Sequence, residues 1–177
     1  MPTLNMSLRL FAIVIAALTI AGCSTITVNQ DYNTDYDFSK LKTFGFLPIT
    51  ENSGIDQINA NRIKDAINKN LSARGYTPSE QADFGIALYF STKTKTSVQD
   101  YGYGYGYGHW GMRDVEVSQY DEGTLVIDFI DIAQKELVWR GSGTGVVSGS
   151  ASTEERTTKI NNAVTQILAQ FPPTKDK

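Results

Sequence analysis

Cysteine and histidine are nearly absent from this chain of 177 residues, which contains one of each. A disulfide needs two cysteines and a structural zinc site usually needs about four Cys or His ligands, so the chain by itself can build neither. A basic excess is also missing, because 16 Lys and Arg stand against 19 Asp and Glu. Nucleic acid is therefore not an expected partner, since phosphate backbones attract basic surfaces. The sequence has no Gly-rich phosphate loop with its Lys, and we expect no metal and no cofactor.

The first 22 residues have the three parts of an export signal. A short start carries Arg9 as its only charge, an apolar run extends from Leu10 to Leu18, and small residues follow. A helix that crosses a bilayer needs about 20 apolar residues, so this shorter run predicts a cleavable signal and not an anchor helix.

The signal ends in Leu18-Thr19-Ile20-Ala21-Gly22-Cys23, which resembles the lipobox of bacterial lipoproteins. The resemblance implies that Cys23 is acylated and that cleavage occurs on its N-terminal side. Its acyl chains would then hold the domain at a membrane, since each buried CH₂ contributes about 0.8 kcal/mol. The next residue is Ser24. In Gram-negative lipoproteins, Asp at that position favours the inner membrane, so Ser24 favours the outer membrane, with the domain on the periplasmic side.

Hydrophobic periodicity predicts strands and helices in a mixed order. Strands are expected at residues 25–29, 43–47, 84–98, 115–117, 124–130 and 136–146. Amphipathic helices are expected at residues 55–74, closed by Gly75, and 152–171, opened by a capping box at Ser152 and Glu155. Asp37 is expected to cap a one-turn helix. Runs of strands with two helices indicate an α+β fold, a two-layer sandwich with both helices on one face of a mostly antiparallel sheet. The chain thus divides into a signal peptide at 1–22 and one domain at 23–177.

Five segments in their order resemble a family of bacterial lipoproteins known as domain of unknown function 4136. They are Asp35-Tyr36-Asp37-Phe38-Ser39-Lys40-Leu41-Lys42-Thr43-Phe44; Arg74-Gly75-Tyr76 with Ala82-Asp83; and Glu122-Gly123-Thr124-Leu125-Val126-Ile127-Asp128 with Leu137-Val138-Trp139-Arg140-Gly141. The resemblance implies the fold and the lipid anchor, and it assigns no catalytic residue.

Residues 99–112 contain a regular Tyr-Gly repeat. Its aromatic and imidazole side chains are Tyr101, Tyr103, Tyr105, Tyr107, His109 and Trp110. Glycine at every second position loosens the backbone and favours a low-complexity loop. Tyr rings combine an apolar face with a hydroxyl group, so the same segment is a candidate partner-binding loop. We do not expect His109 to act as a base, because its flanks do not hold it in place.

Asp128 is an acid within an apolar strand and therefore needs a partner. If Asp131 pairs with Glu136, Asp128 lies opposite Trp139 and can accept its indole N–H. A shift by one residue would instead pair Asp128 with Arg140. In both alternatives Asp128 stabilises the fold and does not act in catalysis. We therefore expect Asp128, Trp139, Arg140 and Gly141 to form a structural motif.

No pair of catalytic side chains stands out in the sequence. We expect a non-catalytic outer-membrane lipoprotein, anchored at Cys23, whose domain binds an envelope protein or glycan or has a structural role. One alternative is an auxiliary or assembly lipoprotein of an envelope transport complex. The other is a periplasmic hydrolase that uses Asp128 or His109.

Overall fold

The computed structural model describes residues 26–100 and 115–173. Cys23, Ser24 and the Tyr-Gly repeat, with His109 and Trp110, lie outside the described residues. In chain order the elements are β1 (Thr27–Tyr32), η2 (Phe38–Lys40), β2 (Thr43–Phe46), η3 (Glu51–Ser53), α2 (Gln57–Ala73), β3 (Thr77–Pro78), β4 (Phe84–Asp100), β5 (Val115–Asp131), β6 (Glu136–Val147) and α3 (Thr153–Leu168).

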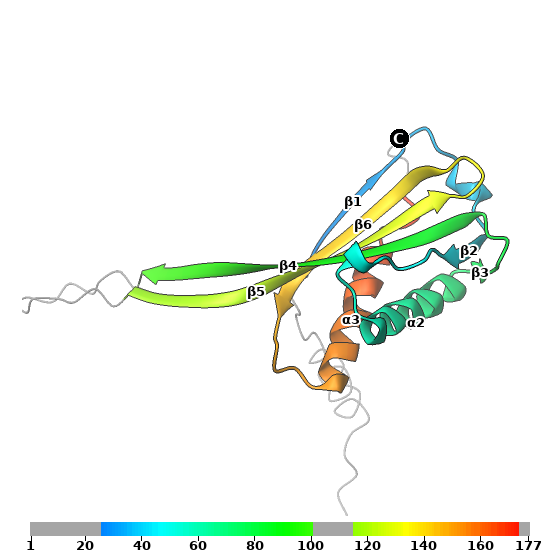
Figure 1. The fold of residues 1–177 in the computed structure, drawn as a ribbon. Helices are drawn as coiled ribbons and strands as arrows, with labels where there is room; N and C mark the ends of the chain where they lie inside the picture. The colour runs from blue at the N-terminus through cyan, green and yellow to red at the C-terminus, as the bar shows by residue number, and fades with distance from the viewer. Residues whose placement is uncertain (1–25, 101–114, 174–177) are drawn as a thin grey trace, which may run out of the picture.

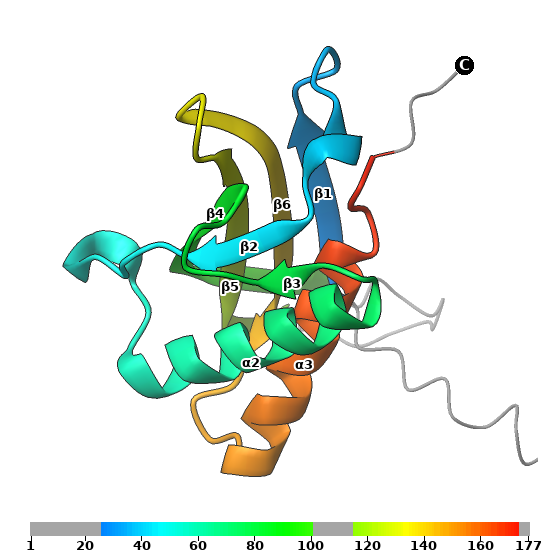
Figure 2. The same ribbon diagram turned by 90° about the vertical axis from the view of Figure 1, so that its right-hand side faces the viewer.

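The strands of the described chain form one sheet in the order β1-β6-β5-β4-β2-β3. The pairs β1/β6, β6/β5 and β5/β4 are antiparallel, and β4/β2 and β2/β3 are parallel. Helices α2 and α3 lie side by side and pack against one face of this sheet (Figures 1 and 2). The predicted α+β fold with a mostly antiparallel sheet is therefore confirmed.

The long hairpin of β4 and β5 differs from the sequence prediction. The strands expected at 115–117 and 124–130 are one continuous strand, because β5 pairs with β4 from Asp131 opposite Phe84 to Val115 opposite Asp100. β6 pairs with β5 only as far as Asp121. Beyond that point β4 and β5 leave the body of the molecule as a two-stranded ribbon (Figure 1).

Local hydrogen bonds set the ends of the helices as their sequences predict. Asp37 accepts the amide of Ser39 at the start of η2. Ser152 and Glu155 form the expected capping box of α3. α2 is followed by Gly75 at φ +87°, a backbone conformation that favours glycine.

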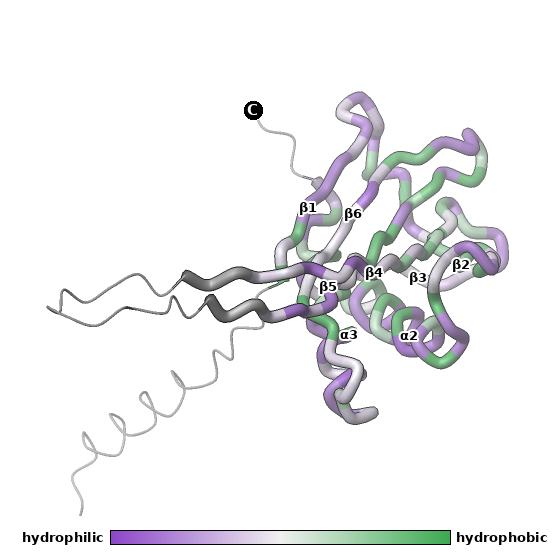
Figure 3. Tube along the Cα trace, turned by 60° about the vertical axis from the view of Figure 1, so that its left-hand side comes forward, coloured by the Kyte–Doolittle hydropathy of each residue, from purple (hydrophilic) through white to green (hydrophobic). Residues whose placement is uncertain are grey.

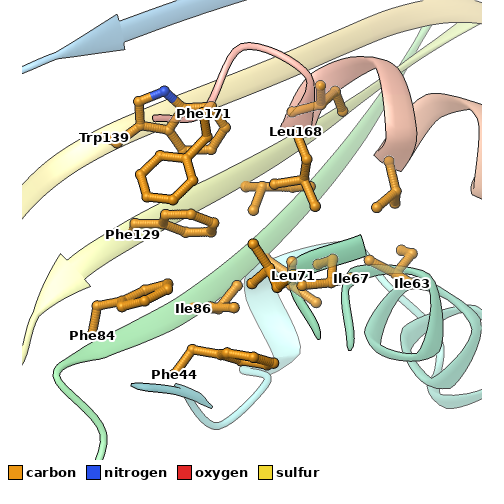
Figure 4. Close-up of a cluster of buried hydrophobic side chains, with 14 of the residues drawn as sticks. Phe44, Ile63, Ile67, Leu71, Phe84, Ile86, Phe129, Trp139, Leu168 and Phe171 are labelled. Carbon is orange, nitrogen blue, oxygen red and sulfur yellow. The ribbon is translucent and has the colours of Figure 1, made fainter. Parts of the chain in front are cut away.

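An aromatic cluster fills the space between the sheet and the helices (Figure 4). The ring of Phe171 lies 4.7 Å from that of Phe129 and 5.3 Å from that of Trp139, measured between centroids. α2 contributes Ile63 and Ile67 to the same core. Along β4 and β5, side chains alternate between this core and the opposite face of the sheet, which we call the open face because neither helix covers it. β1, at one edge, is predominantly hydrophilic (Figure 3).

Candidate functional site

The register of β5 and β6 places Asp128 opposite Arg140. Asp131 pairs with Glu136 as expected, but a register shift between Phe129 and Ile130 puts Phe129 opposite Trp139. The expected pairing of Asp128 with Trp139 is therefore wrong, and the one-residue shift is what the strands adopt. The physical reason is packing: the extra residue, Val138, is fully buried, as is Trp139. A bulge lets two successive apolar residues of one strand enter the core.

Arg140 and Asp128 form a two-point ion pair on the open face. The guanidinium donates from Nε to Oδ1 at 2.7 Å and from Nη2 to Oδ2 at 2.6 Å. The Asp128 side chain is 5% exposed and that of Arg140 is 49% exposed. The hydrogen bonds to Asp128 raise the pKa of Arg140, and the nearby Tyr89 and Asp31 add to this rise. Both oxygens of the carboxylate are thus engaged by a positive charge, while one side of the guanidinium faces solvent.

Apolar side chains lie on the same sheet face as this ion pair. Tyr89 is 44% exposed and Leu137 is 45% exposed. Leu47 and Ile132 lie over Gly85, where a Cβ would approach them within 3 Å. We define the open-face patch as Leu47, Tyr89, Ile130, Ile132, Leu137 and Arg140. Exposed apolar groups that share a face with an Arg and a Tyr are typical of a surface that binds a partner.

Trp139 points away from the open face and into the core. Its indole nitrogen donates to the Gln30 side chain of β1 at 3.1 Å. A Cβ at Gly141 would lie 2.3 Å from the Trp139 ring and 2.5 Å from Ile167 of α3. Glycine at this position therefore leaves room for the indole and for α3 against the sheet.

A second polar contact, which the sequence analysis missed, joins two distant parts of the chain. The Tyr36 hydroxyl donates to Oδ2 of Asp131 at 2.5 Å, and both side chains are buried. Burial and this hydrogen bond raise the pKa of Tyr36. Burial alone would raise the pKa of Asp131, but hydrogen bonds from Tyr36 and from the amides of Gln134 and Ala133 outweigh it and lower that pKa. The apolar pattern of the sequence carries no signal for such a contact, since 95 positions separate the partners.

Other residues of the family-like segments also hold the fold together. Oδ2 of Asp83 accepts the amides of Lys42 and Thr43. The guanidinium of Arg74 donates to the carbonyls of Leu168, the last residue of α3, and of Phe171. These contacts tie the strand and helix ends to one another, so the segments that carry the resemblance build the scaffold.

Several side chains that often serve in catalytic or metal sites are absent from the described residues. These residues include no His and no Cys, and no group of three or more carboxylates in them could hold a metal ion. Two open hollows, of about 370 Å³ beside the start of α2 and about 400 Å³ beside η2, lie on the surface. Within the described ranges, no helix is both long and apolar enough to cross a membrane.

The described residues form an α+β domain in which two helices cover one face of the sheet and leave the other face open. The chain belongs to the family described as a domain of unknown function (DUF4136), whose model matches residues 28–173. Comparison with curated proteins finds none that matches the sequence.

Solved structures resemble the chain at low sequence identity. A PDZ domain protein from Parabacteroides distasonis is 16% identical at a TM-score of 0.58; the match covers 95% of this chain and 41% of that one. This chain therefore spans less than half the length of that relative, and the likeness concerns the fold alone. A PelC dodecamer from Paraburkholderia phytofirmans is 12% identical at a TM-score of 0.48, over 82% of this chain and 96% of that one.

Proposed function

We propose that the protein is an outer-membrane lipoprotein, anchored through acyl chains on Cys23, whose periplasmic domain binds another envelope component through the open-face patch. The observation that carries the binding role is the exposure of Tyr89, Ile132 and Leu137 on the same sheet face as Arg140, the face that the helices leave uncovered. The lipobox ending at Cys23 supports the anchor.

The chemistry of the patch favours a protein surface as the bound component. A half-exposed guanidinium beside a Tyr ring and aliphatic side chains matches the composition of protein interfaces, where Arg and Tyr are enriched. The carboxylate of Asp128 keeps the guanidinium in place, so the free side of Arg140 is already oriented for a partner.

A hydrolase that uses Asp128 is less well supported. A general acid or base must exchange a proton with a substrate within hydrogen-bond reach. The Asp128 side chain is almost fully buried and both of its oxygens accept hydrogen bonds from Arg140.

The anchor is tested by labelling cells with a fatty acid that can be detected on the protein. We expect label on the wild type and none on Cys23→Ser, because the substitution removes the sulfur that accepts the diacylglycerol. Label retained on the variant would contradict acylation at Cys23.

The binding surface is tested by cross-linking in intact cells, solubilisation in detergent and purification of the protein with its partners. We expect Leu137→Glu to reduce recovery of a partner that the wild type retains. Ile58→Glu is the matched control, because Ile58 is 65% exposed on α2, away from the open face. Equal recovery from both variants would contradict a role of the patch. A stoichiometric integral-membrane partner would indicate the assembly lipoprotein of a transport complex.

A further inference from the structure

The end of β6 next to the first residues of β1 exposes apolar side chains. Val146 is 59% exposed and Val147 is 38% exposed, and Tyr120 of β5 is 36% exposed. Val146 pairs with Glu122, and Tyr120 is two residues further along β5 on the same face. Because successive residues of a strand point to opposite faces, exposure of both Val146 and Val147 marks the end of the strand and not one face of the sheet.

The chain enters the domain at this same end. β1 begins at Thr27, which pairs with Thr144 of β6, and β6 continues for three more residues to Val147. Four positions separate Thr27 from Cys23. At about 3.3 Å per residue, they span about 13 Å at most, so an acylated Cys23 holds this end of the sheet close to the bilayer surface.

From this position we infer that the β6 end, defined as Tyr120, Val146 and Val147, contacts the lipid surface. The inference rests on the proposed anchor at Cys23 and adds the orientation of the domain. Tyr side chains favour the membrane–water interface, and valines gain by leaving water. Ser148 to Ser152, which follow β6, include no charged residue.

Charged groups of both signs lie near the β6 end, where the acidic Asp121 of β5 pairs with Val147. Nζ of Lys95 lies 2.7 Å from a carboxylate oxygen of Glu122, and the Lys95 side chain remains 49% exposed. Arg156, at the start of α3, is also exposed. Val146 and Val147 pair with Glu122 and Asp121 of β5, at the base of the ribbon of β4 and β5, and both side chains remain exposed.

The same orientation directs the open-face patch away from the bilayer. Leu137 lies at the opposite end of β6, nine residues from Val146, which corresponds to about 30 Å along a strand. Lipid contact at one end of β6 thus leaves Leu137 and Ile132 free for a partner in the periplasm.

The test uses the acylated full-length protein with a fluorescent probe on one introduced cysteine, since acylation occupies the only native one. Val146→Cys is compared with Leu137→Cys, an exposed apolar residue of the same strand. The proteins are added to vesicles of phosphatidylethanolamine and phosphatidylglycerol that contain a lipid with a nitroxide on its headgroup. We expect a blue shift and a loss of emission at residue 146, and neither at residue 137.

Flotation of the same vesicles distinguishes failure of the proposed orientation from failure of the proposed anchor. Protein that floats but is quenched equally at both positions overturns the orientation and leaves the anchor intact. Protein that does not float overturns the anchor and the orientation together.

A second pair of variants tests the side chains themselves. With the probe at Ser148→Cys, we expect Val146→Asp with Val147→Asp to abolish quenching while flotation persists. Leu137→Asp is the matched control and should leave quenching unchanged. Unchanged quenching in the double variant would overturn the contact.

Discussion

Arg140 binds both oxygens of the Asp128 carboxylate because the bulge at Val138 shifts the pairing of β6 with β5 by one residue. This shift places Arg140 directly opposite Asp128. The pair is asymmetric: the acid is buried and the base is half exposed. Removal of the Arg140 side chain should therefore lower the free energy of unfolding by a different amount than removal of the Asp128 side chain.

Arg140→Ala is expected to destabilise the domain by about 2–3 kcal/mol, because it leaves a buried carboxylate without its hydrogen bonds. Asp128→Ala is expected to cost about 1 kcal/mol, since water can solvate the exposed guanidinium. Urea unfolding at pH 7 measures both. Equal losses of unfolding free energy in the two variants would argue against this asymmetry of the ion pair.

Gly141→Ala is expected to cost about 1–3 kcal/mol, because its Cβ would overlap the Trp139 ring and Ile167. The cost should be smaller in a Trp139→Phe background, which removes the overlapping ring atoms; a double-mutant cycle measures this coupling. Gly149→Ala is the control, since no atom lies within 4 Å of the Cβ it would add. Additive effects at 139 and 141 would contradict the overlap.

Tyr36→Phe is expected to destabilise the domain by about 1–2 kcal/mol near neutral pH through loss of the hydrogen bond to Asp131. The folded pKa of Asp131 lies below its unfolded value, so its contribution to stability is present above about pH 4 and is lost as the pH falls through the folded pKa. The difference in unfolding free energy between wild type and Tyr36→Phe should therefore disappear under acid conditions. Urea midpoints between about pH 3 and pH 7 measure this difference. Tyr120→Phe, which changes an exposed ring, should have the stability of the wild type at every pH.

Ser24→Asp is expected to move the acylated protein from the outer to the inner membrane in a Gram-negative cell that sorts lipoproteins by this residue. Density-gradient fractionation of membranes measures the change. Ser24→Ala should remain with the outer membrane. An unchanged profile for the Asp variant would contradict the sorting role of Ser24.

Replacement of Tyr101, Tyr103, Tyr105 and Tyr107 by Ser is expected to change the free energy of unfolding by no more than about 0.5 kcal/mol. The apolar face of the hairpin that these rings could otherwise cover, with Ile127 and Phe129, is already buried in the core beneath the helices. A loss of stability would contradict the loop interpretation. Reduced recovery of a partner at unchanged stability would identify the repeat as a binding segment.

Local patterns in the sequence were sufficient to predict the α+β class and the type of most helices and strands. Alternation along residues 84–90 predicts a strand with one apolar face, and the signals at Ser152 and Gly75 mark helix ends through bonds within a few residues. The lipobox prediction at Cys23 likewise depends on contiguous residues alone.

The partner of Asp128 was decided only in the folded chain. A bulge of one residue exchanges the faces of every later side chain, and the alternation of β6 by itself fits either register. The burial of both Val138 and Trp139 against the helices selects the register with Arg140. Likewise, Tyr36 meets Asp131 only because the sheet and the segment before η2 bring positions 95 residues apart together. The spacing of nearby residues does not predict such contacts, since the need to pair these polar groups arises from their burial in the complete fold.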